Sequence, residues 1–353
     1  MFNIDTILRK NIKELIPYSS ARDEFKGEAS VYLDANENSF GSPLAESYNR
    51  YPDPLQFKVK QRLTEIKGVP SQNIFLGNGS DEAIDILYRA FCNPGIDNVI
   101  TLPPTYGMYE VSANINDIEI RKIKLKADYQ LDMEGISEAI DEHTKIIFIC
   151  SPNNPTGNSI DRQDIETILV NFSGLVVIDE AYINFSRQKT FIQELTEYPN
   201  LVVLQTLSKA WGLAGLRIGM AFASEEIIEV FNKVKPPYNI NEASQKLALE
   251  ALQNVDQVND WIKKTVAERE KLVKELVLLD VVIKIYPSDA NFILVKTTDP
   301  KGIYQYLVKY GIIVRDRSNV ELCEGSLRIT IGTPEENIIL LNALKTFQES
   351  NKI

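Results

Sequence analysis

The chain has 353 residues, and 38 Lys and Arg against 49 Asp and Glu give it a formal net charge of -11. That length can hold two domains, and a composition of 44% hydrophobic and 25% charged residues is typical of a globular enzyme. The acidic balance argues against nucleic acid or an anionic membrane as a partner, because both attract basic proteins. No apolar run in the sequence approaches the length of a membrane span.

The N-terminal segment MFNIDTILRKNIKELI lacks the uninterrupted apolar stretch of a secretory signal. Apolar residues recur in it at helical spacing, at Ile4, Ile7, Leu8, Ile12 and Leu15, which predicts a short amphipathic helix. The chain has 3 cysteines and no CxxC pair. This pattern predicts reduced, buried thiols and a cytoplasmic protein.

From about residue 70 to 235, short apolar runs alternate with helical patterns. The predicted strands are Ile74–Leu76, Val99–Leu102, Ile118–Ile123, Lys145–Cys150, Leu175–Asp179, Leu201–Thr206 and Arg217–Ala223. Several of them are continuously apolar, as in IIFIC and LVVI, which is typical of strands covered on both faces. The repeated strand–helix units therefore predict an α/β domain whose mainly parallel sheet is covered by helices on both faces.

The pattern changes after about residue 240. Two long helical patterns, Ala243–Asn254 and Gln257–Leu279, precede shorter apolar runs and predict a smaller α+β domain. The two prolines of KPPYNIN cannot continue a helix, so the joint is predicted there. We expect a large domain over residues 40–238, with residues 1–39 and 239–353 forming an N-terminal arm and a small C-terminal domain.

One histidine, His143, stands in the polar stretch DEHTK before a predicted strand. A single histidine excludes a multi-histidine metal site, and we expect no metal. A serine triad would have to use His143, yet no GxSxG elbow accompanies it. We interpret His143 as a loop residue.

A glycine-flanked turn precedes a predicted helix in LGNGSDEAIDIL. The backbone N–H groups of Gly79, Ser80 and Asp81 at such a turn can bind an anion, for example a phosphate. Tyr106, in PPTYGMY, offers a flat apolar face on which an aromatic ring can stack. A loop of this composition is weak evidence by itself.

Two further segments place polar side chains directly after apolar strands. In CSPNNPTGN, two prolines restrict the backbone around Asn154 and hold its amide in place. In LVVIDEAYINF, Asp179 follows four apolar residues, where a carboxylate without a cationic partner is costly. Tyr182 lies three residues further along.

The segment TLSKAWGLAGLRIG begins at the end of another predicted strand, where doubly wound folds bind their ligands. Lys209 can attack an aldehyde once its amine is deprotonated. Arg217 supplies a fixed cation suited to a phosphate, and the hydroxyls of Thr206 and Ser208 can donate to the same group.

Together these segments fit one cofactor, pyridoxal 5′-phosphate (PLP). Lys209 can form a Schiff base with its aldehyde, and Asp179 can pair with its protonated ring nitrogen. Asn154 and Tyr182 can bind its ring oxygen. Each segment alone also has a plainer interpretation: Lys209 can be a surface residue, Asp179 a helix cap, and Asn154 part of a turn.

The motifs SPNNPTG, DEAY and SKAWGLAGLRIG stand in the order and spacing of the fold type I PLP-dependent aminotransferases. The chain resembles this family from PYSSAR (Pro17–Arg22) to LRITIGT (Leu327–Thr333). YLDANENSFG, RYPDP and PYSSAR are similar to its histidinol-phosphate branch. Ser39 and Lys235 depart from that branch, which usually has Pro and Arg there.

The resemblance implies a role for each matching residue. Lys209 matches the Schiff-base lysine, which also moves a proton between two carbons. Tyr51 matches a tyrosine that reaches the cofactor phosphate of the neighbouring subunit, so a homodimer with shared active sites is expected. Arg328 matches the arginine that binds the substrate α-carboxylate, and Arg315 and Tyr18 match groups that hold the distal anion. Histidinol phosphate has no α-carboxylate, so the division of contacts between the two arginines stays open.

The resemblance also implies a reaction, the transamination of histidinol phosphate with 2-oxoglutarate to imidazole-acetol phosphate and glutamate. The alternatives are an aromatic or broad-range amino-acid aminotransferase and a phospho-amino-acid decarboxylase on the same fold. They stay open because the bond that breaks at Cα is the one perpendicular to the cofactor ring, and the sequence does not determine that angle. A PLP-binding regulator would need an appended DNA-binding domain or a disrupted set of site residues, and the chain shows neither.

Overall fold

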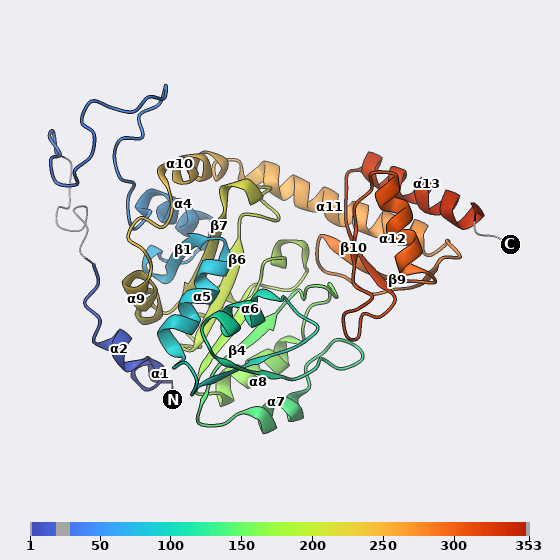
Figure 1. The fold of residues 1–353 in the computed structure, drawn as a ribbon, viewed down its shortest axis with the longest axis horizontal. Coiled ribbons are helices and arrows are strands. Elements are labelled where there is room, and N and C mark those ends of the chain that lie inside the picture. The colour runs from blue at the N-terminus through green and yellow to red at the C-terminus, as the bar shows by residue number, and fades with distance from the viewer. Residues whose placement is uncertain (1, 19–28, 351–353) are drawn as a thin grey trace.

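The computed structural model describes residues 2–18 and 29–350. Two sheets organise this part of the chain, a seven-stranded sheet and a four-stranded sheet. The long helix α11 (Val255–Leu276) leads from the large sheet toward the small one (Figure 1). Among the described residues, no helix combines the length and the apolar character that crossing a membrane requires.

The large sheet has the strand order β1-β7-β6-β5-β4-β2-β3. Its strands are β1 (Ile74–Asn78), β2 (Asn98–Thr101), β3 (Glu119–Lys122), β4 (Thr144–Cys150), β5 (Leu175–Asp179), β6 (Leu201–Thr206) and β7 (Ile218–Ala223). Strand β7 is antiparallel to both of its neighbours, and the β3, β2, β4, β5 and β6 pairings are parallel. The predicted mainly parallel sheet is therefore confirmed.

Helices cover both faces of this sheet. Neighbouring residues of β4 belong to opposite cores: Ile147 and Ile149 pack on the face of α4 and α8, and Ile146 and Phe148 on the face of α5, α6 and α9. This double burial is why β4 reads as a continuous apolar run. The helices are α4 (Phe57–Lys67), α5 (Ser80–Phe91), α6 (Met108–Ile115), α7 (Met133–Ala139), α8 (Arg162–Asn171), α9 (Glu225–Val234) and α10 (Glu242–Ala251). Short 3-10 turns lie at Ser71–Asn73, Ile183–Phe185, Phe191–Glu194 and Ala214–Leu216.

The small sheet is antiparallel and has the order β10-β11-β9-β8. Its elements are β8 (Val282–Ile285), β9 (Phe292–Thr297), β10 (Arg315–Asp316) and β11 (Ser326–Thr330), with α12 (Pro300–Lys309) and α13 (Pro334–Ser350). These elements share a separate apolar core with the end of α11. Helix α10 and the start of α11 instead pack with the core of the large sheet, through Ala248, Leu252 and Val258. The predicted division after residue 238 stays a prediction.

The N-terminal segment does not form the single helix that its pattern predicts. It forms two short helices, α1 (Ile4–Ile7) and α2 (Lys10–Lys13), which are interrupted at Leu8 and Arg9. The backbone N–H of Arg9 donates to the carbonyl of Ala90 at 3.0 Å instead of continuing the helix. A tertiary hydrogen bond to the end of α5 thus interrupts the helix, although Ile7 and Ile12 are buried as the spacing suggests.

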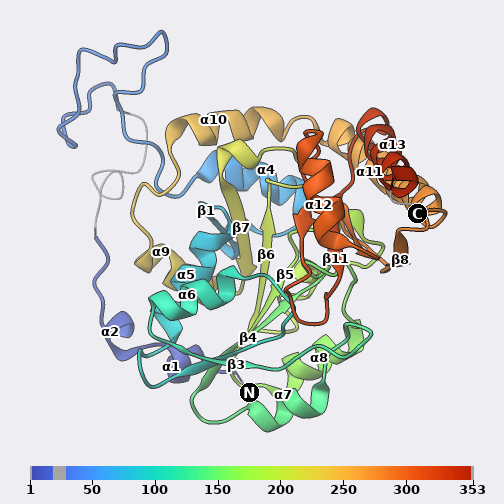
Figure 2. The ribbon, with the colours of Figure 1, turned by 45° about the vertical axis from the view of Figure 1, so that its right-hand side comes forward.

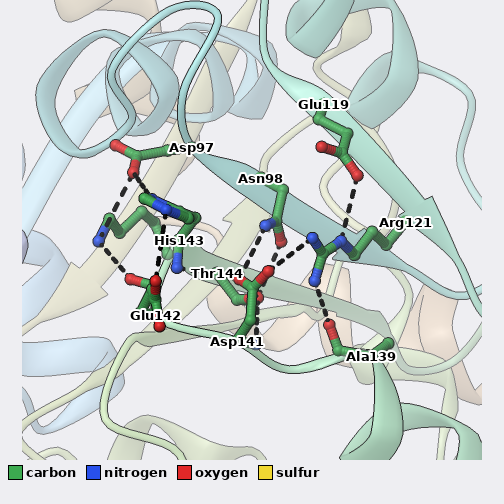
Figure 3. Close-up of polar contacts among 10 residues, drawn as sticks. Asp97, Asn98, Glu119, Arg121, Ala139, Asp141, Glu142, His143 and Thr144 are labelled. Atoms are coloured by element: carbon green, nitrogen blue, oxygen red, sulfur yellow. Dashed lines mark hydrogen bonds and ion pairs between the residues drawn. The ribbon is translucent and has the colours of Figure 1, made fainter.

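The amino end of the large sheet carries a polar network among the starts of β2, β3 and β4 (Figure 3). Thr144 donates its hydroxyl to Asn98 Oδ1 at 2.8 Å, and Asn98 Nδ2 donates to Asp141 Oδ1 at 3.0 Å. Arg121 donates to the other oxygen of Asp141 at 2.6 Å. His143 lies in this loop with its side chain 48% exposed and its Nδ1 3.7 Å from Asp97, so its interpretation as a loop residue is confirmed.

Candidate active site

A cavity of about 620 Å³, measured out to its open mouth, lies at the carboxyl ends of β1, β4, β5 and β6. This is the sheet edge where doubly wound folds bind ligands, and the volume suits a small molecule. The cavity brings together the predicted cofactor-binding residues other than Tyr51. Its walls are formed by Gly79, Ser80, Asp81, Tyr106, Cys150, Asn154, Asp179, Ala181, Tyr182, Thr206, Ser208, Lys209, Ala214 and Arg217.

Lys209 follows β6 in a turn whose backbone is held by a bond from Gly212 N to Lys209 O at 3.1 Å. Its Nζ lies 5.7 Å from the centre of the Tyr182 ring. Partial burial, and then the charge of Arg328, lower the pKa of Lys209. A lowered pKa makes the neutral amine more available, which is what a nucleophile for an aldehyde requires.

Asp179 ends β5 and is only 3% exposed. Its Oδ2 accepts a hydrogen bond from Tyr109 Oη at 2.7 Å, and its Oδ1 accepts one from the N–H of Ala181 at 3.0 Å. Burial raises the pKa of Asp179, and within the described residues this carboxylate forms no ion pair. A buried acid at a cavity wall can be matched by a cation of the ligand, and the protonated ring nitrogen of PLP is such a cation.

Asn154 and Tyr182 both line the cavity, and both contact side chains of the small sheet. Arg328, in β11, donates through Nη1 to Asn154 Oδ1, which leaves the N–H groups of the Asn154 amide for a ligand oxygen. The Tyr182 ring packs edge-on against Phe292 of β9, with 5.1 Å between ring centres. The small sheet therefore helps to hold two predicted cofactor ligands in place.

The phosphate end of the site depends on a close approach of two backbones. Gly79 has a φ of 74°, and a Cβ on Gly79 would lie 2.7 Å from Arg217 Nη2. The N–H of Gly79 already donates to the carbonyl of Arg217 at 2.7 Å. The predicted backbone cradle therefore narrows to Ser80 and Asp81, in the first turn of α5, where N–H groups lack intrahelical partners.

Arg217 provides the cation at this end, with its side chain 53% exposed. Its Nη2 lies 3.6 Å from Asp81 Oδ2, so Asp81 orients the guanidinium. Asp81 Oδ1 also accepts a hydrogen bond from Tyr106 Oη at 3.0 Å, which fixes the ring predicted to stack on the cofactor.

The two predicted hydroxyl donors differ in what they contact. Thr206 Oγ1 donates to the carbonyl of Ile218 at 3.3 Å and accepts from the N–H of Ser208 at 3.0 Å. Thr206 therefore supports the lysine loop, and its donation to a phosphate stays a prediction. Of the two predicted donors, the Ser208 hydroxyl is the one that these contacts leave for a ligand.

Four of the residues expected at the site, Tyr18, Tyr51, Arg315 and Arg328, are not among those that line the cavity. Tyr51 stacks on Tyr238, with 4.5 Å between ring centres, beside a separate surface hollow. Tyr18 is 76% exposed. Arg315 is exposed and pairs in register with Arg328 across β10 and β11, so it stands next to the site without lining it.

Three further residues at the site were missed by the sequence reasoning. Tyr109, one helical turn after Tyr106, meets Asp179, and Cys150 lines the cavity next to it. Arg317, just beyond β10, does not line the cavity, but its charge acts on both Tyr182 and Arg328. Burial, and then the charge of Arg315, lower the pKa of Arg317. The spacing of Tyr109 from Tyr106 was the available signal. The positions of Cys150 and Arg317 depend on how the strands pair, which the sequence alone does not show.

The chain matches the family model for aminotransferase class I and II over residues 31–344. It belongs to this family. The protein is accordingly a PLP-dependent aminotransferase, and the residues that line the cavity fit that cofactor. The resemblance seen in the motifs is confirmed.

The chain is similar to known proteins over nearly its whole length. The chain is 56% identical over 346 residues to a histidinol-phosphate aminotransferase of Cytophaga hutchinsonii, covering 98% of this chain and 99% of that one. It is also 56% identical over 348 residues to one of Parabacteroides distasonis, covering 99% and 100%. The crystal structure of a histidinol-phosphate aminotransferase of Sinorhizobium meliloti with pyridoxal-5′-phosphate has a TM-score of 0.78 at 24% identity, covering 90% of each chain. This likeness confirms the predicted fold.

Proposed function

We propose that this aminotransferase transfers the amino group of histidinol phosphate to 2-oxoglutarate, giving imidazole-acetol phosphate and glutamate in histidine biosynthesis. The observation that carries the proposal is the 56% identity, over nearly the full length of both chains, to relatives named for that reaction. The cavity agrees with it, because it combines a reactive lysine, a buried acid and a phosphate-binding end.

Bound PLP supplies an electron sink that allows the substrate Cα to lose a proton. Lys209 holds the cofactor and carries that proton on its Nζ. Asp179 pairs with the ring nitrogen, and Asn154 and Tyr182 bind the ring oxygen. The strand ends that position these side chains keep them rigid, which favours reaction at a single carbon.

The cofactor phosphate is held by the amides of Ser80 and Asp81, the hydroxyl of Ser208 and the guanidinium of Arg217. The helix N-terminus and the arginine both place positive charge at this end. Tyr106 stacks on the ring. Asp81 keeps both Tyr106 and Arg217 oriented.

Substrate anions are met by Arg328 and Arg315. Arg328 is half-buried and held by Asn154, and it takes the α-carboxylate of glutamate. Arg315, opposite it in register, takes the distal anion together with Tyr18. The phosphate of histidinol phosphate is presented to the same pair of arginines.

A homodimer completes the site. Residues 29–50 form an open loop that extends away from the sheet (Figure 1; Figure 2). It exposes the apolar side chains of Val31, Leu33, Phe40 and Leu44, which need a covering surface. Tyr51 follows this loop and binds the cofactor phosphate of the second subunit. The three cysteines are free and buried, which suits a cytoplasmic enzyme.

The visible absorption spectrum of the PLP-loaded protein tests the reaction. Histidinol phosphate should remove the band of the lysine-bound cofactor, and 2-oxoglutarate should restore it. A band that responds to aromatic amino acids instead would favour the broad-range alternative. Release of CO2 from a phospho-amino acid, with no restoration by 2-oxoglutarate, would favour a decarboxylase.

Mixing two inactive variants tests the dimer. Tyr51→Ala and Lys209→Ala subunits, once exchanged, should form dimers with one intact site. Activity should recover to at most about a quarter of the wild-type value, because random exchange makes half of the dimers mixed. Confirmed exchange without recovery would place Tyr51 outside the shared site.

A further inference from the structure

A buried tyrosine supports Asp179 from behind the cavity wall. Tyr109, in α6, is 0% exposed, and its Oη donates to Asp179 Oδ2 at 2.7 Å. Its ring is stacked on Phe148 at 4.8 Å between centres. Tyr88 Oη donates to the backbone carbonyl of Tyr109 at 2.8 Å, so both the ring and the backbone of Tyr109 are held.

The carboxylate of Asp179 is oriented by two donors. Tyr109 meets one oxygen and the N–H of Ala181 meets the other. A carboxylate has about four acceptor sites, so sites remain for a group in the cavity. Two fixed donors on a fully buried acid determine where those remaining sites point.

We propose that Tyr109 is a positioning residue that stabilises the charged form of Asp179 and aims its carboxylate at the ring nitrogen of the cofactor. The inference rests on the proposed role of Asp179. It goes beyond that role because it assigns a function to a side chain that lines no part of the cavity.

The surroundings of Asp179 explain why such support is needed. The ionisable groups near it come from α5, α6, β4 and the segments after β2, β5 and β6. They are Asp81, Tyr106, Tyr109, Cys150, Tyr182 and Lys209. Burial raises the pKa of Asp179, and Asp81 adds to this, whereas the hydrogen bonds from Tyr109 and Ala181 and the charge of Lys209 lower it.

Tyr109 keeps its proton throughout the neutral range. Burial, and then the charge of Asp179, raise the pKa of Tyr109 well above its ordinary value. The phenol therefore remains a donor whether or not a ligand is bound. Without this donor, ionised Asp179 is less stable. The proton between the PLP ring nitrogen and the Asp179 carboxylate then shifts toward the carboxylate.

The variant Tyr109→Phe tests the inference in the full-length protein. A hydrogen bond to a charged group is worth roughly a factor of 10 to 100 in an equilibrium constant, so PLP should bind about 10- to 100-fold more weakly. The pH midpoint at which the visible band of the PLP-loaded protein shifts should also rise. The band reports the protonation of the Lys209 nitrogen that holds PLP, and a neutral ring nitrogen leaves less positive charge beside it. An unchanged affinity and pH midpoint would overturn the proposal.

A matched control is Tyr129→Phe, which removes another buried phenolic hydroxyl, bonded to the carbonyl of Leu322, without touching Asp179 or Tyr109. It should lower thermal stability and leave the PLP affinity and the pH midpoint unchanged. If it weakens PLP as much as Tyr109→Phe does, the effect is one of packing and the proposal fails.

A PLP analogue with carbon in place of the ring nitrogen separates the support by Tyr109 from the role of Asp179 itself. It cannot pair with Asp179, so calorimetric titration should give equal affinities for wild type and Tyr109→Phe. A persistent difference would overturn the proposal. Asp179→Ala tests the underlying role: loss of PLP affinity there, with none in Tyr109→Phe, refutes only the support by Tyr109, and no loss in Asp179→Ala refutes the role of Asp179 itself.

Discussion

The two ends of the large sheet are both polar, yet they differ in how their side chains are paired. At the amino end, Asn98, Arg121, Asp141 and Thr144 bond to one another (Figure 3). At the carboxyl end, Asp179 is buried without a cationic partner among the described residues.

This difference distinguishes the end of the large sheet that stabilises the fold from the end that binds a ligand. A polar group that is satisfied by its neighbours stabilises the fold, whereas a buried charge left without a partner is costly unless a ligand completes it. Perturbed pKa values at the carboxyl end, lowered for Lys209 and raised for Asp179, fit the same interpretation. Both ends of the sheet are polar, so only the hydrogen bonds and ion pairs of their side chains show which end binds a ligand.

The largest effect is expected from Lys209→Ala. Turnover should fall by roughly 10³-fold or more, because a positioned proton-transfer group alone contributes about 10²–10⁴. Borohydride reduction and peptide mass spectrometry should find PLP on Lys209 in the wild type. Lys67 is the control, since burial lowers its pKa to about 8 and its Nζ is bonded to Gln205 away from the cavity. Label on Lys67 instead would mean that a lowered pKa, rather than the cavity, selects the lysine.

A smaller effect is expected from Arg217→Ala, at the phosphate end. The affinity for PLP should fall about 10- to 100-fold, since hydrogen bonds to a charged group are worth that much. Arg121→Ala removes a cation from the opposite sheet end and should leave the affinity unchanged while lowering thermal stability. Equal losses of affinity in the two variants, measured by titration, would contradict the contrast between the ends.

Asn98→Ala should affect stability alone. The Asn98 side chain is buried and bonded to both Asp141 and Thr144, so its loss leaves buried groups unsatisfied at a cost of about 1–3 kcal/mol. Urea unfolding should report this loss, with kcat/KM unchanged. A clear decrease in kcat/KM would show that the amino end contributes to the reaction.

The smallest effect concerns acid stability. Hydrogen bonds, first from Asn98, lower the pKa of Asp141 below its ordinary 3.8. A lowered carboxyl pKa contributes stability that is present above the unfolded-state value and lost as the pH falls through the folded-state value. Asp141→Asn should therefore make the decline of unfolding free energy below about pH 4 shallower. If the decrease in unfolding free energy at low pH is the same in the variant, the network does not stabilise the charged form of Asp141.

The alternation of apolar runs and helical patterns was enough to predict the large sheet. Strand β4 was expected at Lys145–Cys150 and spans Thr144–Cys150, because burial on both faces leaves a continuous apolar run. The N-terminal helix was wrong because a hydrogen bond from Arg9 to the distant Ala90 interrupts it. Local spacing carries no information about such a partner.

At the site, the sequence by itself was enough to predict which side chains carry the chemistry, since Lys209, Asp179 and Arg217 stand in motifs whose spacing is local. Only the tertiary structure decided how those groups are supported. In the folded chain, the Thr206 hydroxyl and the Gly79 N–H donate to backbone carbonyls, and the Tyr109 hydroxyl donates to Asp179. The physical reason is that hydrogen bonding and burial depend on which elements pack together, and residues 70 positions apart meet only when the sheet and its helices form.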